Sequence, residues 1–201
     1  LNTIHTKFES AGYVRVGFEC YALPDEKMTK AFNDGTAHYG AAGHQTGGRV
    51  NFISVGSSAK GNLGDEYYSQ SHYDLTSYKK LIDENKFPIF RGMTLNYDDK
   101  IRQYVTQQLR SYFKINFKNI NEYYDIDSKK YFQKEIEYLE DYIEDGLVNI
   151  SDDELIMTQI GRDFSQNITN VFDYYDPPHK SYNERLKTIK NSKKVQSKIL
   201  L

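Results

Sequence analysis

The sequence predicts an α+β fold, with strands and a glycine-rich loop in the N-terminal half and helices in the C-terminal half. Short apolar runs separated by glycine precede residue 97, whereas apolar residues recur every three or four positions after it. Aromatic residues make up 14% of the chain, and disordered chains are poor in them. We expect a single domain over residues 1–201, subdivided near residue 97 into a strand-rich part (1–97) and a helical part (98–201).

The strand-rich part contains three candidate strands and two candidate helices. Alternating or short apolar runs predict strands over residues 13–22, 49–55 and 87–90. Helices are expected over residues 25–33 and 73–84, because apolar residues gather on one side of each segment.

Glycine is concentrated between these elements. Eight of the 13 glycines fall between Gly35 and Gly64, which predicts a long loop or several turns. No lysine followed by serine or threonine comes after the glycines, so the stretch is not a P-loop. It also lacks the regular spacing of a dinucleotide-binding fold. A flexible loop is the simplest interpretation, and a lid over a ligand is the alternative.

The helical part opens with two amphipathic stripes. Asp98 and Asp99 suit the start of a helix, because acidic groups favour its N-terminus. The apolar residues that follow recur at three- and four-residue steps: Ile101, Tyr104, Val105, Leu109, Tyr112 and Phe113. A second helix is expected over residues 132–143, ending at Gly146, a natural C-cap.

A third, short helix is expected after residue 150. Ser151 and Glu154 have the spacing of a capping box, and Gly161 would end the helix. A proline pair at 177–178 then breaks the chain before a basic segment at 182–201.

The net charge of -2 argues against a general nucleic-acid coat, but the charge is unevenly distributed. The segment 122–154 contains twelve acidic residues and only three lysines. Between residues 180 and 201, six lysines and one arginine face a single glutamate. The basic segment therefore predicts contact with nucleic-acid phosphates or with an acidic protein partner, and a solvated terminal helix is the alternative.

The cysteine and hydropathy patterns bear on the compartment. Cys20 is the single cysteine, so no internal disulfide forms, which suits a reducing compartment such as a cytoplasm, including that of a host cell. No apolar run approaches the length of a membrane span, and no signal peptide is recognised. Because the chain begins with Leu1, we expect a processed product or an excised domain.

The sequence patterns give little support for a metal site or for the active site of a hydrolase. His38 and His44 share the glycine-rich stretch, but no histidine pair has the spacing of helical metal ligands, so no metal is expected. Ser57 follows a candidate strand but lacks the flanking glycine pattern of a nucleophile elbow. Glu135 and Glu137 are most simply part of the solvated face of a helix.

Arg91 is the strongest candidate for chemistry. It follows the apolar run at 87–90 and precedes Gly92, so its guanidinium, which matches two phosphate oxygens at once, would lie at the end of a strand. The sequence Ile-Phe-Arg-Gly at 89–92 resembles the arginine motif of ADP-ribosyltransferases. The resemblance implies that Arg91 and Gly92 bind NAD. It also implies that Ser165, in the segment 161–167, orders the nicotinamide pocket and that Glu184 is the catalytic acid.

A second placement of the same resemblance is open. Arg15 would then be the catalytic arginine, the serine motif would fall at 52–57, and Glu135 and Glu137 would be the acidic pair. Either placement implies a toxin or effector that transfers ADP-ribose from NAD to a protein or other macromolecular target. In the competing interpretation Arg91 is an ordinary surface arginine. The chain would then be a non-enzymatic viral or phage structural component, or a host-interaction protein.

Overall fold

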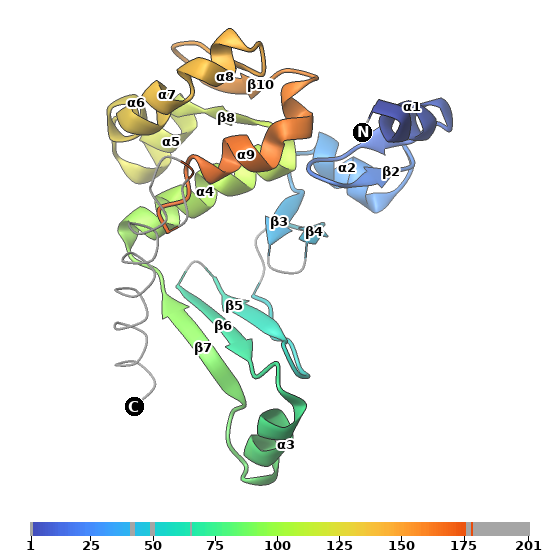
Figure 1. Cartoon of the computed structure of the whole chain (residues 1–201), viewed down its shortest axis with the longest axis vertical. Helices are drawn as coiled ribbons and strands as arrows, with labels where there is room; N and C mark the ends of the chain where they lie inside the picture. The colour runs from blue at the N-terminus through green and yellow to red at the C-terminus, as the bar shows by residue number, and fades with distance from the viewer. Residues whose placement is uncertain (1, 41–42, 49–50, 65, 176–177, 179–201) are drawn as a thin grey trace. The chain divides into compact units, whose positions relative to one another are not determined.

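The computed structural model describes residues 2–40, 43–48, 51–64, 66–175 and 178. These residues form two compact units: unit 1 takes those up to 48 and from 101 onward, and unit 2 takes those between 51 and 100 (Figure 1). Helices and small antiparallel sheets occur together, which confirms the α+β class. The subdivision near residue 97 stays a prediction.

Unit 1 begins with short elements. They are α1 (Asn2–Ser10), β1 (Val14–Arg15), β2 (Tyr21–Ala22), α2 (Lys27–Asn33), β3 (His38–Gly40) and β4 (Gly43–Gln45). The strand predicted over 13–22 is wrong in detail, because the chain reverses within it and Arg15 pairs with Tyr21. Gly17, at φ +80°, supplies a left-handed backbone conformation in this reversal that side chains rarely adopt. Helix α1 is an element that was not predicted from the sequence.

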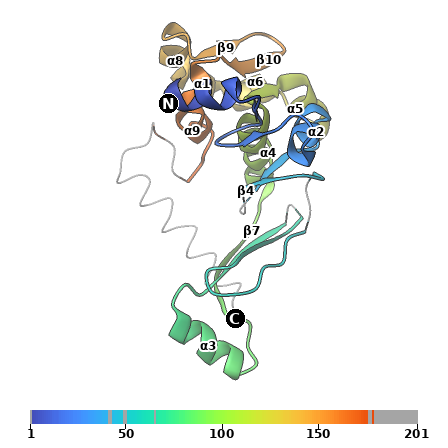
Figure 2. The same ribbon diagram turned by 90° about the vertical axis from the view of Figure 1, so that its right-hand side faces the viewer.

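The long helix α4 (Tyr97–Tyr112) confirms the periodicity that predicted it. Asn96 and Asp99 close its first turn reciprocally, since each side chain accepts a hydrogen bond of 2.9 Å from the other's backbone N–H. Shorter helices complete the unit: α5 (Phe117–Tyr124), α6 (Ser128–Tyr131), α7 (Gln133–Tyr138), α8 (Glu140–Glu144) and α9 (Ser165–Asn170). Helix α9 contributes Ile168 to the same buried core as α4 (Figures 1 and 2).

A three-stranded antiparallel sheet also belongs to unit 1, in the order β8 (Lys114–Asn116), β10 (Glu154–Met157), β9 (Val148–Ile150). The helix predicted after Ser151 is therefore wrong. The Ser151 hydroxyl accepts a hydrogen bond from the Glu154 N–H at 3.1 Å, but this contact closes the turn between β9 and β10 instead of capping a helix. The C-terminal half thus carries strands as well as helices.

One hydrophobic core holds the helical part of unit 1 together. Phe132 is fully buried and packs edge-on against Phe172, with ring centroids 5.3 Å apart. Other core residues exposed by 1% or less are Ile101, Val105, Leu109, Phe113, Ile115, Ile120, Leu139, Val148, Leu155 and Met157. Many of these core residues belong to the apolar stripes that predicted the helices.

Unit 2 is a three-stranded antiparallel sheet, in the order β5 (Lys60–Leu63), β6 (Tyr67–Ser71), β7 (Ile89–Thr94), with α3 (Leu75–Asp83) at one end of it (Figures 1 and 2). The helix predicted over 73–84 is confirmed. The strand predicted over 49–55 is wrong for the described residues, where Phe52 makes only an isolated bridge to Asn62. The strand predicted over 87–90 begins at Ile89 and continues to Thr94.

Candidate functional site

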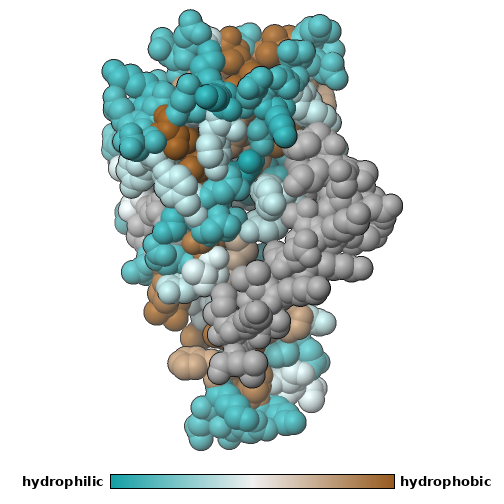
Figure 3. Space-filling view, turned by 90° about the vertical axis from the view of Figure 1, so that its left-hand side faces the viewer, coloured by the Kyte–Doolittle hydropathy of each residue, from teal (hydrophilic) through white to brown (hydrophobic). Residues whose placement is uncertain are grey.

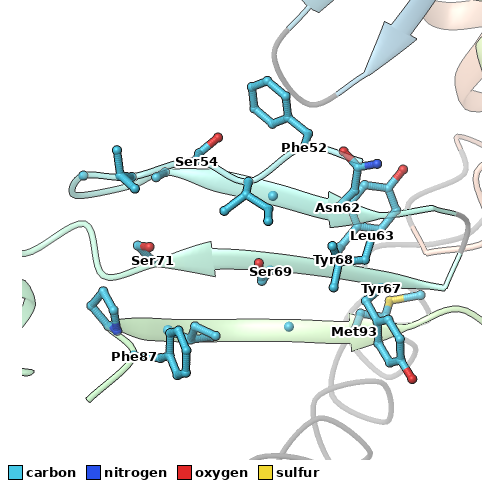
Figure 4. Close-up of a pocket in the computed structure, with 18 of the residues that line it drawn as sticks. Phe52, Ser54, Asn62, Leu63, Tyr67, Tyr68, Ser69, Ser71, Phe87 and Met93 are labelled. Carbon is cyan, nitrogen blue, oxygen red and sulfur yellow. The ribbon is translucent and has the colours of Figure 1, made fainter. Parts of the chain in front are cut away.

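A cavity of unit 2 opens on one face of its sheet and has a volume of about 550 Å³ (Figure 4). A row of small residues crosses the three strands beneath it, because Gly61 pairs with Ser69 and Ser69 pairs with Gly92. No room is left for a larger residue at Gly61, since a Cβ there would lie 2.8 Å from the Phe52 carbonyl oxygen. The small row leaves a hollow that larger side chains surround.

The surroundings of this hollow are apolar and open. Val55 and Phe87, both at its rim, are 91% and 86% exposed. Other apolar side chains around it are Phe52, Ile53, Leu63, Tyr67, Tyr78, Ile82, Pro88, Ile89 and Met93. Figure 3 shows one face of the molecule, on which apolar patches lie among hydrophilic surface. An exposed apolar area of this kind marks an interaction or ligand surface.

Arg91 does not line this cavity, although Gly92 does. Successive residues of a strand face opposite sides of a sheet, so Arg91 lies on the other face, where its Nε donates a hydrogen bond of 2.8 Å to the Gln70 side chain. The position expected for Arg91 at the end of a strand is wrong, because Gly92 is paired with Ser69 and β7 continues to Thr94. Arg91 is therefore an exposed arginine inside a strand.

The residues of the predicted NAD site are distributed over both units and a segment outside the described residues. Ser165 begins α9 in unit 1, where its hydroxyl is buried and has no hydrogen-bond partner among the described residues. Arg91 lies in unit 2. Glu184 and the basic segment lie outside the described residues. The roles given to these residues stay untested.

In the second placement, the two glutamates and the arginine each contact other residues. Glu135 is 7% exposed and accepts a hydrogen bond of 2.9 Å from Arg102, so it is one half of an internal ion pair. Glu137 accepts from Gln133 on the surface of the same helix. Arg15 is also engaged, but with a different carboxylate.

That carboxylate is Asp163, in the 3₁₀ helix η1 (Gly161–Phe164). Arg15 donates one hydrogen bond of 2.9 Å to its Oδ1 and another of 2.9 Å to the Arg162 carbonyl oxygen. His5 on α1 brings its Nε2 to 2.8 Å from the same Oδ1, at an ion-pair distance although not aligned as a hydrogen bond. On its other side, the His5 ring contacts the Tyr21 hydroxyl. These side chains converge from α1, the β1–β2 hairpin and η1.

Sequence reasoning missed most of this cluster. Arg15 was named, but His5, Arg162 and Asp163 were not given a role. No local spacing connects them, since Arg15 and Asp163 are 148 positions apart. The one available signal was the adjacent arginine and aspartate that precede α9.

A second histidine occupies a constrained position in unit 1. The His44 ring contacts the Phe18 carbonyl oxygen, and Gly17 lies directly against the ring. Burial lowers the pKa of His44, and this effect outweighs the hydrogen bond to Phe18 and the charge of Glu19, which raise it.

In the part of the chain that the structure describes, no group of three or more histidine, cysteine, aspartate or glutamate side chains could hold a metal ion. None of the helices in the described ranges is long and apolar enough to cross a membrane.

Comparison with known proteins gives a consistent result. The chain is 34% identical over 168 residues to the oxygen-independent coproporphyrinogen III oxidase of Pseudomonas aeruginosa, covering 84% of this chain and 36% of that protein. The oxidase of the same name from Escherichia coli is 30% identical over 165 residues, covering 82% and 36%. The Helicobacter pylori protein is 30% identical over 175 residues, covering 87% and 38%. No family model matches the chain.

Among solved structures, the E. coli coproporphyrinogen III oxidase, described as a radical SAM enzyme, superposes with a TM-score of 0.81 at 29% identity. The match covers 87% of this chain and 40% of that one. The chain therefore spans well under half the length of the curated relatives it matches.

These findings overturn the functional hypotheses drawn from the sequence. The resemblance to ADP-ribosyltransferases is wrong, because it rests on a few residues whereas the similarity to the oxidases extends over most of the chain. The toxin or effector hypothesis and the structural-protein alternative are wrong for the same reason. The expectation of NAD without a metal is also contradicted, since radical SAM enzymes of this type use S-adenosylmethionine and an iron–sulfur cluster.

Proposed function

We propose that this chain is part of an oxygen-independent coproporphyrinogen III oxidase of the radical SAM type. One observation carries the proposal: the similarity to the P. aeruginosa oxidase extends over 84% of the chain, so it includes residues of both units. The TM-score of 0.81 against the E. coli oxidase supports it independently of any single motif.

The residues of this chain do not fit the iron–sulfur cluster that such chemistry uses. Iron–sulfur clusters are held by several cysteine thiolates, and this chain has only Cys20. Burial also raises the pKa of the Cys20 thiol, which disfavours the thiolate that binds iron. On this proposal the cluster ligands belong to the part of the protein that matches the remainder of the relatives.

The open face of unit 2 supports the same proposal. The exposed apolar face of these three strands marks an interaction surface, so we expect another element to cover it. We assign that role to the portion of the oxidase that this chain does not span. A protein partner at the basic segment remains a separate proposal, as does a reducing compartment, which the single cysteine supports.

The test is anaerobic turnover by the protein at its full natural length, with its cluster reconstituted. Coproporphyrinogen III, a chemical reductant and S-adenosylmethionine are supplied, and the tetrapyrrole products are separated by chromatography after oxidation to porphyrins. We expect a product that requires S-adenosylmethionine and forms without oxygen. A cluster-loaded protein that leaves coproporphyrinogen III unchanged contradicts the proposal.

A further inference from the structure

Unit 1 contains a cavity of about 510 Å³, lined by apolar and charged side chains, between α1, the β1–β2 hairpin and η1. A cavity of this size lies within the range of small-molecule sites. Its apolar wall comes from Ile4, Phe8 and Phe18, and its charged wall from two arginines and Asp163. Glu19 lies at its edge and is exposed to solvent, where its charge is screened.

The charged wall of the cavity has more positive than negative side chains, with two arginines and one aspartate. Asp163 is engaged by Arg15 at 2.9 Å and by His5 at 2.8 Å, so its carboxylate is already shared between two partners. Arg162 makes no ion pair and its side chain donates no hydrogen bond within the described part of the chain. Its Nε is buried and has no acceptor in the ranges that the structure describes. Among the described residues, the guanidinium of Arg162 therefore has no anionic partner.

The surroundings of Arg162 make this isolation costly. Its guanidinium carbon lies 5.1 Å from the centroid of the Phe113 ring, and that of Arg15 lies at the same distance from the same ring. Burial and the charge of Arg15 both lower the pKa of Arg162. An arginine nevertheless remains charged at neutral pH. A half-buried cation beside a second cation is destabilising unless an anion neutralises it.

We propose that this cavity binds a carboxylate group of the tetrapyrrole substrate, with Arg162 as its direct partner. The planar fork of a guanidinium presents parallel N–H donors to two carboxylate oxygens, and Arg162 has those donors to spare. Arg15 contributes positive potential while its Nη1 and Nη2 donors remain on Asp163 and the Arg162 carbonyl; its Nε also has no acceptor among the described residues. The assignment rests on the proposed function, because coproporphyrinogen III carries carboxylate side chains.

The experiment uses the full-length protein and two probes. Coproporphyrin III, the stable oxidised form of the substrate, is titrated by fluorescence anisotropy, and inorganic phosphate is tested by its effect on the melting temperature. The variant is Arg162→Gln. Lys118→Gln is the control because it removes the same charge from an exposed position of the same unit.

Arg162→Gln is expected to weaken coproporphyrin III binding about tenfold or more, which is the range for a lost charge-assisted hydrogen bond. Lys118→Gln should bind within about twofold of the wild type. In the absence of ligand, the melting temperature of Arg162→Gln should equal or exceed that of the wild type, since an unpaired charge has been removed. A purely structural arginine would lower it.

The outcomes separate the site from the function. If coproporphyrin III does not bind but phosphate raises the melting temperature of the wild type and not of Arg162→Gln, the cavity binds inorganic anions and the tetrapyrrole assignment is overturned. If Arg162→Gln binds coproporphyrin III as tightly as the wild type, the cavity is not the site although the proposed function survives. A lowered melting temperature in Arg162→Gln without ligand overturns the binding role as well.

Discussion

Arg15 in β1 and Asp163 in η1 are joined by a 2.9 Å hydrogen bond although 148 positions separate them in the chain. The bond ties the N-terminal hairpin to the segment that leads into α9. The side chains of Arg15 and Asp163 are only 10% and 22% exposed, so the pair is shielded from solvent more than most surface ion pairs.

Removing the Asp163 carboxylate should therefore destabilise unit 1. Asp163→Asn leaves Arg15 without its ionised partner, and we expect a loss of about 2 kcal/mol in the free energy of unfolding, measured with urea. Asp152→Asn is the control, since Asp152 pairs with Lys129 on the open surface. Equal urea midpoints for the two variants would show that the Arg15–Asp163 pair is not structural.

Gly17 offers a test of close packing at the hairpin. A Cβ at this position would lie 2.5 Å from the His44 ring, 2.7 Å from the Arg110 carbonyl oxygen and 2.9 Å from the Ser111 carbonyl oxygen. Gly17→Ala should cost about 3 kcal/mol or more, from backbone strain and overpacking together.

Gly12→Ala provides the matched control for that substitution. Gly12 has nearly the same φ, +83°, but no atom lies within 4 Å of the position that a Cβ would take there. Only the backbone strain remains, so we expect a cost of about 1 kcal/mol. Similar losses in the two variants would show that the close approach of His44 to Gly17 is not present in solution.

The aromatic core of unit 1 should tolerate truncation far less than the open face of unit 2. Phe132 is fully buried against Phe172, so Phe132→Ala should cost about 3–5 kcal/mol. Phe87 is 86% exposed, and Phe87→Ala should leave the urea midpoint of the chain nearly unchanged. A large loss from Phe87→Ala would mean that its ring is already covered in the isolated chain.

His44 should make the stability of unit 1 depend on pH. Its pKa is lowered in the folded state, so the unfolded chain binds the proton more readily as the pH falls. The free energy of unfolding should therefore decrease below pH of about 6.5, the ordinary pKa of histidine, and level off below the folded pKa. Urea midpoints at pH 7.5 and 5.0 measure the change. A His44→Gln variant with an unaltered pH profile would contradict the assignment.

Local patterns predicted some elements well and misassigned others. The stripe through Ile101, Val105 and Leu109 predicted α4, because these three residues form the apolar face that the helix packs into the core. The Ser151–Glu154 pattern misled, since a serine hydroxyl can close a hairpin turn as well as a helix start. Where the apolar run is short, residue propensities do not distinguish a hairpin turn from the start of a helix.

The candidate site was largely beyond sequence reasoning. The cluster of His5, Arg15 and Asp163 forms only when three distant segments meet, and no spacing encodes it. The Phe-Arg-Gly match was too short to be specific. Its arginine and glycine are successive residues of β7, which pairs with β6, so they lie on opposite faces of the sheet. Similarity over most of the chain carried information that a motif could not.

The most direct test of the account is the anaerobic assay of the full-length, cluster-loaded protein with coproporphyrinogen III, run with and without S-adenosylmethionine. The account predicts conversion of the tetrapyrrole only when S-adenosylmethionine is present. Unchanged coproporphyrinogen III in both reactions would contradict it.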